Sequence, residues 1–74
     1  MTHPTTTAPP IFRNATNRTV YEELASLLGQ VASVHTLSIR LGMSEARVRS
    51  TLGQLRNRGL VDRVDGTPSV WEVV

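Results

Sequence analysis

Apolar side chains recur at helical spacing in three successive stretches of the chain. The first stretch contains Val20, Leu24, Leu27 and Leu28. These positions share one face of a helix with 3.6 residues per turn. Thr19 and Glu22 have the spacing of a capping box and predict a helix start near Thr19. Gly29 is expected to end this helix, and residues 30–32 to be extended, with a short strand at 31–32.

The second and third stretches lie close together. Their apolar positions are Val34, Leu37 and Leu41, then Val48, Leu52 and Leu55. Ser33 and Ser44 stand where N-caps would lie. Gly42 and Gly59 stand where the two helices would end. Because the second helix ends so near the next cap, residues 33–59 predict a helix-turn-helix.

A β-hairpin is predicted at the end of the chain. Residues 60–64 and 70–73 are rich in β-branched side chains, and residues 65–68 form a turn signal. The expected fold is mainly α with a small β-hairpin. It is a winged helix-turn-helix, with three helices and a C-terminal wing. Trp71 is expected to plug the open end of this small core.

The start of the chain has a different composition. Residues 1–14 are rich in Thr and Pro and are expected to form a disordered N-terminal arm. Residues 15–74 would then form the winged-helix domain. Ile11 and Phe12 are apolar exceptions within the arm and are expected to pack on the domain as an anchor.

Composition excludes several classes of function. The chain has 74 residues, no cysteine and two histidines, too few for a usual zinc site. No metal, cofactor or small-molecule ligand is expected, and no side chains have a spacing usable for catalysis, so an enzyme is not expected. His35 is interpreted as a helix-surface residue. No apolar run could cross a membrane and no secretory signal is visible, so a cytoplasmic location is expected.

Charge points toward nucleic acid. All eight cationic side chains are arginine, whose planar fork of donors suits phosphate and guanine edges. A GC-rich genome would also replace lysine with arginine. Position carries more weight, because residues 40–63 hold six arginines against two acids, a net charge of +4. The six are Arg40, Arg47, Arg49, Arg56, Arg58 and Arg63.

Taken together, residues 19–74 resemble the winged-helix core of bacterial regulators such as the MarR and GntR families. The stretches that carry the resemblance are residues 37–44, the apolar positions 48, 52 and 55, and residues 58–63. The resemblance implies a DNA-binding role. It places the third helix in the major groove and the hairpin over the DNA backbone.

A narrower resemblance concerns the wing. Residues 66–71 are similar to the wing of Z-DNA-binding (Z-alpha) domains, and residues 35–38 with 41–42 fit their second helix. In that family the wing proline and the tryptophan help to contact the left-handed backbone, beside an Asn and a Tyr on the third helix. This chain has Arg49 and Gly53 at those two positions, and Ser69 at the second wing proline. Recognition of a left-handed duplex is therefore the minor alternative.

A helical wheel defines the candidate DNA face. Opposite the core positions lie small and polar side chains with arginines on both sides, Arg49 and Arg56 on one flank and Arg47 and Arg58 on the other. A glycine in the middle of a helix is unfavourable, and close approach to a partner would explain Gly53. The expected DNA-binding residues are Ser44, Ala46, Arg47, Arg49, Ser50, Gly53, Gln54, Asn57, Arg63 and Thr67.

Two functional hypotheses follow. The first is a double-stranded DNA-binding protein, either a small bacterial transcriptional regulator or an accessory factor of a phage or mobile element. The alternative is a winged-helix module for protein–protein interaction in a larger complex. The acids near the DNA face, Glu45, Asp62 and Asp65, favour this alternative. Homodimerisation is left open, with Ile39 as a candidate contact together with Tyr21 or the apolar pair in the arm.

Overall fold

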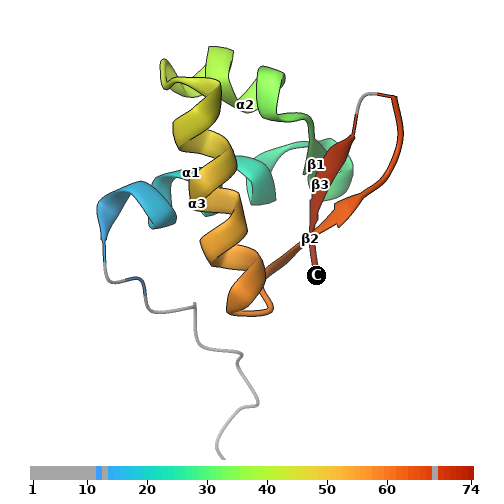
Figure 1. Cartoon of the computed structure of the whole chain (residues 1–74). Coiled ribbons are helices and arrows are strands. Elements are labelled where there is room, and N and C mark those ends of the chain that lie inside the picture. The colour runs from blue at the N-terminus through green and yellow to red at the C-terminus, as the bar shows by residue number, and fades with distance from the viewer. Residues whose placement is uncertain (1–11, 13, 68) are drawn as a thin grey trace, which may run out of the picture.

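The computed structural model describes residues 12, 14–67 and 69–74, and it confirms the winged-helix fold (Figure 1). The predicted hairpin and the short strand before the second helix are both present. The elements are α1 (Ala15–Ser26), a 3-10 turn (Leu28–Gln30), β1 (Val31–Ala32), α2 (Val34–Leu41), α3 (Glu45–Asn57), β2 (Val61–Val64) and β3 (Val70–Val73).

Both ends of α1 differ from the prediction. The helix begins at Ala15 rather than near Thr19, because the Asn14 side chain caps it by accepting from the amide of Asn17 at 2.8 Å. Asn17 is buried, so the added first turn packs against the domain. The helix ends at Ser26, before the predicted Gly29, which lies in the following 3-10 turn at φ 74°. Gln30 has a left-handed φ of 54° and is not extended as predicted.

The predicted caps of the helix-turn-helix are confirmed. The hydroxyl of Ser33 accepts from the amide of Thr36 at 3.1 Å at the start of α2. The hydroxyl of Ser44 accepts from the amide of Arg47 at 3.2 Å at the start of α3. Gly42 ends α2 in the left-handed region at φ 65°, which is available to glycine without strain. The chain therefore turns sharply between the two helices.

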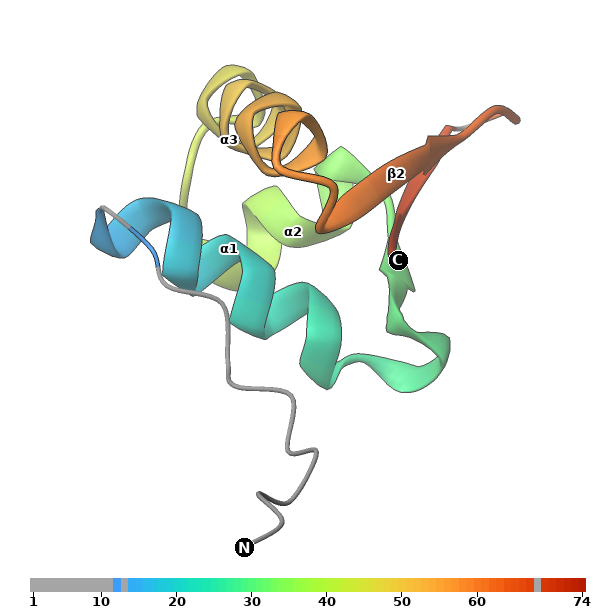
Figure 2. The ribbon, with the colours of Figure 1, turned by 90° about the horizontal axis from the view of Figure 1, so that it is seen from below.

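A three-stranded antiparallel sheet closes one side of the helices (Figure 2). The strand order is β1-β3-β2, so the short β1 extends the hairpin on its β3 side. In this register Trp71 of β3 lies between Ala32 of β1 and Arg63 of β2. Ala32, Arg63 and Trp71 therefore share one face of the sheet, since directly paired residues point the same way.

The core lies between the three helices and this face of the sheet. Its fully buried side chains are Val20, Leu24, Leu37, Val48, Leu52 and Leu55, with Val61 1% exposed. Trp71 is 7% exposed and packs in the same cluster, which confirms the predicted core plug. The half-buried Phe12 packs against this core, as predicted for the anchor, and its ring centroid lies 5.4 Å from that of Tyr21.

Most of the predicted arm cannot be compared with the structure. Residues 1–11 and 13, including Ile11, lie outside the described residues. The boundary between an arm at 1–14 and a domain at 15–74 remains a prediction. None of the helices in the described part of the chain has the length and apolar character needed to span a membrane.

Candidate nucleic-acid interface

The outer face of α3 carries the small residues that the sequence predicts there. Ala46, Ser50 and Asn57 are exposed, on the side opposite the buried Val48 and Leu52. Gly53 lies on the same face. A Cβ added at Gly53 would meet no atom of the described residues within 4 Å, the backbone of α3 itself apart. Nothing inside the described fold therefore requires a glycine at this position.

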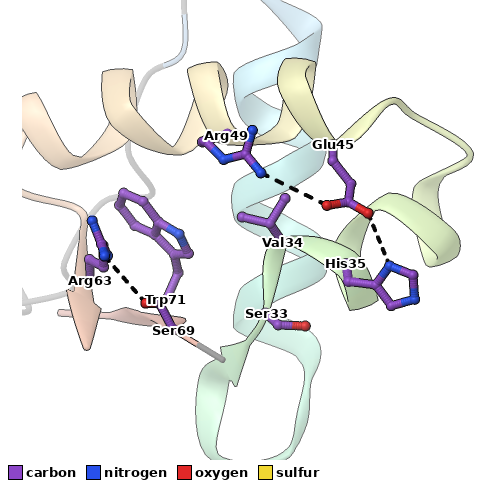
Figure 3. A pocket seen from close by; sticks show the side chains of 8 residues that line it. All are labelled: Ser33, Val34, His35, Glu45, Arg49, Arg63, Ser69 and Trp71. Atoms are coloured by element: carbon purple, nitrogen blue, oxygen red, sulfur yellow. Dashed lines mark hydrogen bonds and ion pairs between the residues drawn. The ribbon is translucent and has the colours of Figure 1, made fainter. Parts of the chain in front are cut away.

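A groove of about 600 Å³ lies on one flank of α3, between that helix, the start of α2 and the hairpin (Figure 3). We call it the wing groove. Its lining residues are Ser33, Val34, His35, Glu45, Arg49, Arg63, Ser69 and Trp71. The groove combines the Trp71 ring with two guanidinium groups, one from α3 and one from β2. Arg49 and Arg63, far apart in sequence, are thus brought to one place.

The position of Arg63 follows from the strand register. It is paired with Trp71, so it lies on the sheet face that turns toward α3. Its Nη2 donates to the hydroxyl of Ser69 at 3.3 Å and lies 3.6 Å from a carboxylate oxygen of Asp65. The predicted wing cation is therefore directed along the hairpin and is paired with the acid at its tip. Thr67, the other predicted wing residue, is exposed.

Glu45 places a carboxylate in the same groove. One oxygen lies 3.0 Å from Nδ1 of His35 on α2, and the other lies 3.8 Å from Nη2 of Arg49. His35 is exposed on the helix surface, as expected. The carboxylate also lies in the first turn of α3, where the helix dipole favours negative charge. Glu45 thus lowers the positive potential at the start of α3, beside the candidate DNA-binding residues Arg47 and Arg49.

Several arginines of the basic stretch 40–63 are paired with acids in the folded protein, so their charge is partly neutralised. Arg40 pairs with Glu23 of α1 at 2.7 Å, and Arg56 pairs with Asp62 of β2 at 3.3 Å. The guanidinium carbon of Arg58 lies over the Phe12 ring, 5.2 Å from the ring centroid. Exposed ion pairs are worth about 0–1 kcal/mol each and are screened by salt. Such pairs can exchange a carboxylate for a phosphate at small cost.

A second, smaller groove of about 280 Å³ lies on the opposite flank of α3, beside the start of α1. We call it the α1 groove. Its lining residues are Asn14, Thr16, Asn17, Arg47, Ser50, Thr51 and Gln54. Arg47 donates from Nη2 to the hydroxyl of Thr16 at 3.0 Å. In this way α1 positions the guanidinium group beside the outer face of α3.

Most of the predicted DNA-binding residues lie in the two grooves or on the outer face of α3 between them, a strip that contains Ala46, Ser50 and Gly53. Arg49 and Arg63 line the wing groove, whereas Arg47, Ser50 and Gln54 line the α1 groove. Sequence reasoning missed Asn14, Thr16 and Asn17 of the α1 groove. The sequence prediction places them in the arm or in the segment before a helix start near Thr19. An Asn cap at position 14 was the available signal.

Comparison with known proteins identifies the fold. The chain is similar to the crystal structure of the Zalpha domain from Carassius auratus PKZ in complex with Z-DNA. The TM-score is 0.72 at 19% sequence identity, covering 80% of this chain and 92% of the other. No protein-family model matches the chain, and no curated protein matches it in sequence. The shared winged-helix fold is thereby shown, whereas membership of the MarR or GntR families is not.

Proposed function

We propose that this protein binds duplex DNA, with α3 in the major groove and the hairpin over the backbone. On this proposal it acts as a small transcriptional regulator or as an accessory factor of a phage or mobile element. The structural neighbour with the same winged-helix fold was solved in complex with Z-DNA, which supports a DNA-binding role. Fold alone does not determine function, so the proposal rests on the α3 surface.

The observation that carries the proposal is Gly53. Glycine inside a helix costs about 1 kcal/mol relative to alanine. An alanine Cβ would fit here without meeting any other part of the described fold. No contact within the described fold therefore offsets the stability that the glycine costs. A partner surface that approaches the α3 backbone closely would explain the glycine, and the exposed Ala46 and Ser50 permit the same approach. The major groove admits a helix in this way.

Arginines beside this strip would supply the phosphate contacts. Arg49 and Arg63 reach the wing groove from two different elements, and their present partners are surface carboxylates at 3.8 and 3.6 Å. Charge-assisted hydrogen bonds from arginine to phosphate are stronger and more directional than these contacts. On this proposal both guanidinium groups turn to the DNA backbone, while Ser50, Gln54 and Asn57 face the base edges.

Fluorescence anisotropy with a labelled mixed-sequence duplex at several salt concentrations tests the proposal. The affinity should fall steeply with salt, by about 0.9 in log K per log unit of salt for each phosphate contacted. Arg47→Ala and Arg49→Ala should weaken binding without unfolding the domain. Arg18→Ala is the matched control, because Arg18 pairs with Glu22 on α1 and lies outside both grooves. Titrations without binding, or insensitive to salt, would overturn the proposal.

The same assay separates right-handed from left-handed duplexes. A second arm uses an alternating cytosine–guanine duplex that base bromination holds in the left-handed form. The structural neighbour was solved with Z-DNA, but this chain has Arg49 and Gly53 where the Z-alpha pattern has Asn and Tyr. We therefore expect tighter binding to the mixed-sequence duplex. Tighter binding to the left-handed duplex would support the minor alternative instead.

A protein-interaction module is the second candidate. It is favoured by the carboxylates of Glu45, Asp62 and Asp65, which pair with arginines around the candidate interface. Ile39, 67% exposed on α2, would suit a homodimer or a partner protein. A stoichiometric protein partner, together with no duplex affinity at about 100 mM salt, would favour this candidate.

A further inference from the structure

The α1 groove has features that the wing groove lacks. Of the described residues that line it, none is acidic, and one is an arginine. The wing groove by contrast contains Glu45, and its Arg63 is paired with Asp65. Among the described residues Arg47 has no carboxylate partner, and its printed contact is the neutral hydroxyl of Thr16. The α1 groove is therefore the more favourable place for an anion.

Asn17 gives independent evidence for a ligand in this groove. It is only 8% exposed, yet within the described chain its side-chain amide makes no hydrogen bond. Its backbone amide is the group that the Asn14 cap satisfies. Among the described residues no side-chain nitrogen or oxygen is both buried and without a hydrogen-bond partner, so the Asn17 amide reaches the solvent in the groove that it lines. With its stem buried and its amide open to the α1 groove, Asn17 offers a fixed donor to a ligand bound there.

The start of α1 adds amide donors to the same groove. The first amides of a helix have no acceptor within that helix, and the dipole places partial positive charge at this end. Asn14 and Thr16, which flank the first residue of α1, both line the groove. Arg47 lines the groove from α3. The groove thus combines a guanidinium group, side-chain amides, hydroxyls and a helix start, which is a donor set suited to a phosphate.

We propose that the α1 groove binds a backbone phosphate of duplex DNA, on the strand opposite to the one that the wing contacts. This inference rests on the proposed function and deepens it. The start of α1 lies on one side of α3 and the hairpin lies on the other (Figures 1 and 2). With α3 in the major groove, its two flanks face the two strands that border that groove. The partner is accordingly a right-handed duplex.

The test uses Asn17→Asp in the full chain. The helix dipole stabilises an acid in the first turn of α1, so the variant should remain folded. Its carboxylate should repel the phosphate and form an ion pair with the guanidinium group of Arg47. We expect duplex affinity about tenfold weaker at 100 mM salt and a salt slope reduced by about one phosphate. Thr19→Asp is the control, because it adds the same charge at an exposed position of α1 outside the groove.

A titration with inorganic phosphate distinguishes between a DNA backbone phosphate and free phosphate as the ligand of the α1 groove. Amide shifts of Ala15, Thr16 and Asn17 are followed by NMR in phosphate and in chloride at equal ionic strength. If the unaltered protein binds duplex and the two Asp variants keep the same slope and affinity, this inference fails and the proposed function stands. Phosphate-specific shifts with an unchanged duplex slope would make it a free-phosphate site and would also overturn the inference. If the unaltered protein binds no duplex, both proposals fail.

Discussion

The carboxylate of Glu45 joins the start of α3 to α2, with Oε2 lying 3.0 Å from Nδ1 of His35. The other oxygen lies 3.8 Å from Arg49, so both oxygens are directed into the wing groove. The helix-turn-helix therefore has a polar side-chain contact between its two helices as well as an apolar core. On the proposed function, the same carboxylate would face the DNA backbone.

Glu45→Gln is expected to increase duplex affinity by a few fold. Removing the carboxylate removes its repulsion of phosphate and releases Arg49. Stability should fall by less than about 1 kcal/mol, because surface pairs and first-turn acids contribute that much at most. Anisotropy and urea unfolding measure the two effects. Glu22→Gln on α1 serves as the control, since Glu22 also pairs with an arginine four residues away. Weaker binding by Glu45→Gln would instead identify the carboxylate as a direct contact to DNA.

Gly53→Ala should separate stability from binding. The added methyl group meets no other part of the described fold within 4 Å, so we expect stability to rise by about 1 kcal/mol. Gly53→Leu should fold as well as the alanine variant but lose duplex affinity by about tenfold or more, because the side chain would hold α3 away from the bases. A loss of stability in Gly53→Ala would show that the glycine is required within the chain itself.

The α1 cap can be located by a pair of alanine variants. Asn14→Ala should lower the free energy of unfolding by about 1 kcal/mol, since it removes the acceptor for the amide of Asn17. Thr19→Ala should be neutral or slightly stabilising, because Thr19 lies inside the helix and alanine has the higher helix propensity. Thermal unfolding followed by circular dichroism measures both. The reverse order would place the helix start near Thr19 after all.

Alanine substitutions of core and surface apolar residues should change the free energy of unfolding by very different amounts. Leu52 is fully buried on the core side of α3, and Leu52→Ala is expected to lower the free energy of unfolding by about 2–5 kcal/mol. A domain of this size has only about 3–5 kcal/mol in total, so this variant should be largely unfolded. Ile39→Ala at an exposed position should stay within about 0.5 kcal/mol. Sedimentation of the Ile39→Ala variant also tests the homodimer, because a dimer built on Ile39 should dissociate.

Much of the fold was predictable because its signals are local. The caps at Ser33 and Ser44 and the left-handed Gly42 act within a few residues of their own backbone. The apolar periodicity of α2 and α3 also identified their buried faces correctly. The start of α1 was not predictable in the same way. Both Asn14 and Thr19 are plausible caps in isolation, and the burial of Asn17 against the domain decides between them.

The amino-acid sequence by itself determined the winged-helix order of elements and the small, polar outer face of α3. Both depend on spacing along one segment. Only the tertiary structure decided which arginines meet acids of other elements, because Arg40 with Glu23 and Arg56 with Asp62 are paired by packing between elements. It also placed Asn17 beside Arg47 in one groove. Such juxtapositions depend on how helices and strands dock, and no local pattern in the chain specifies them.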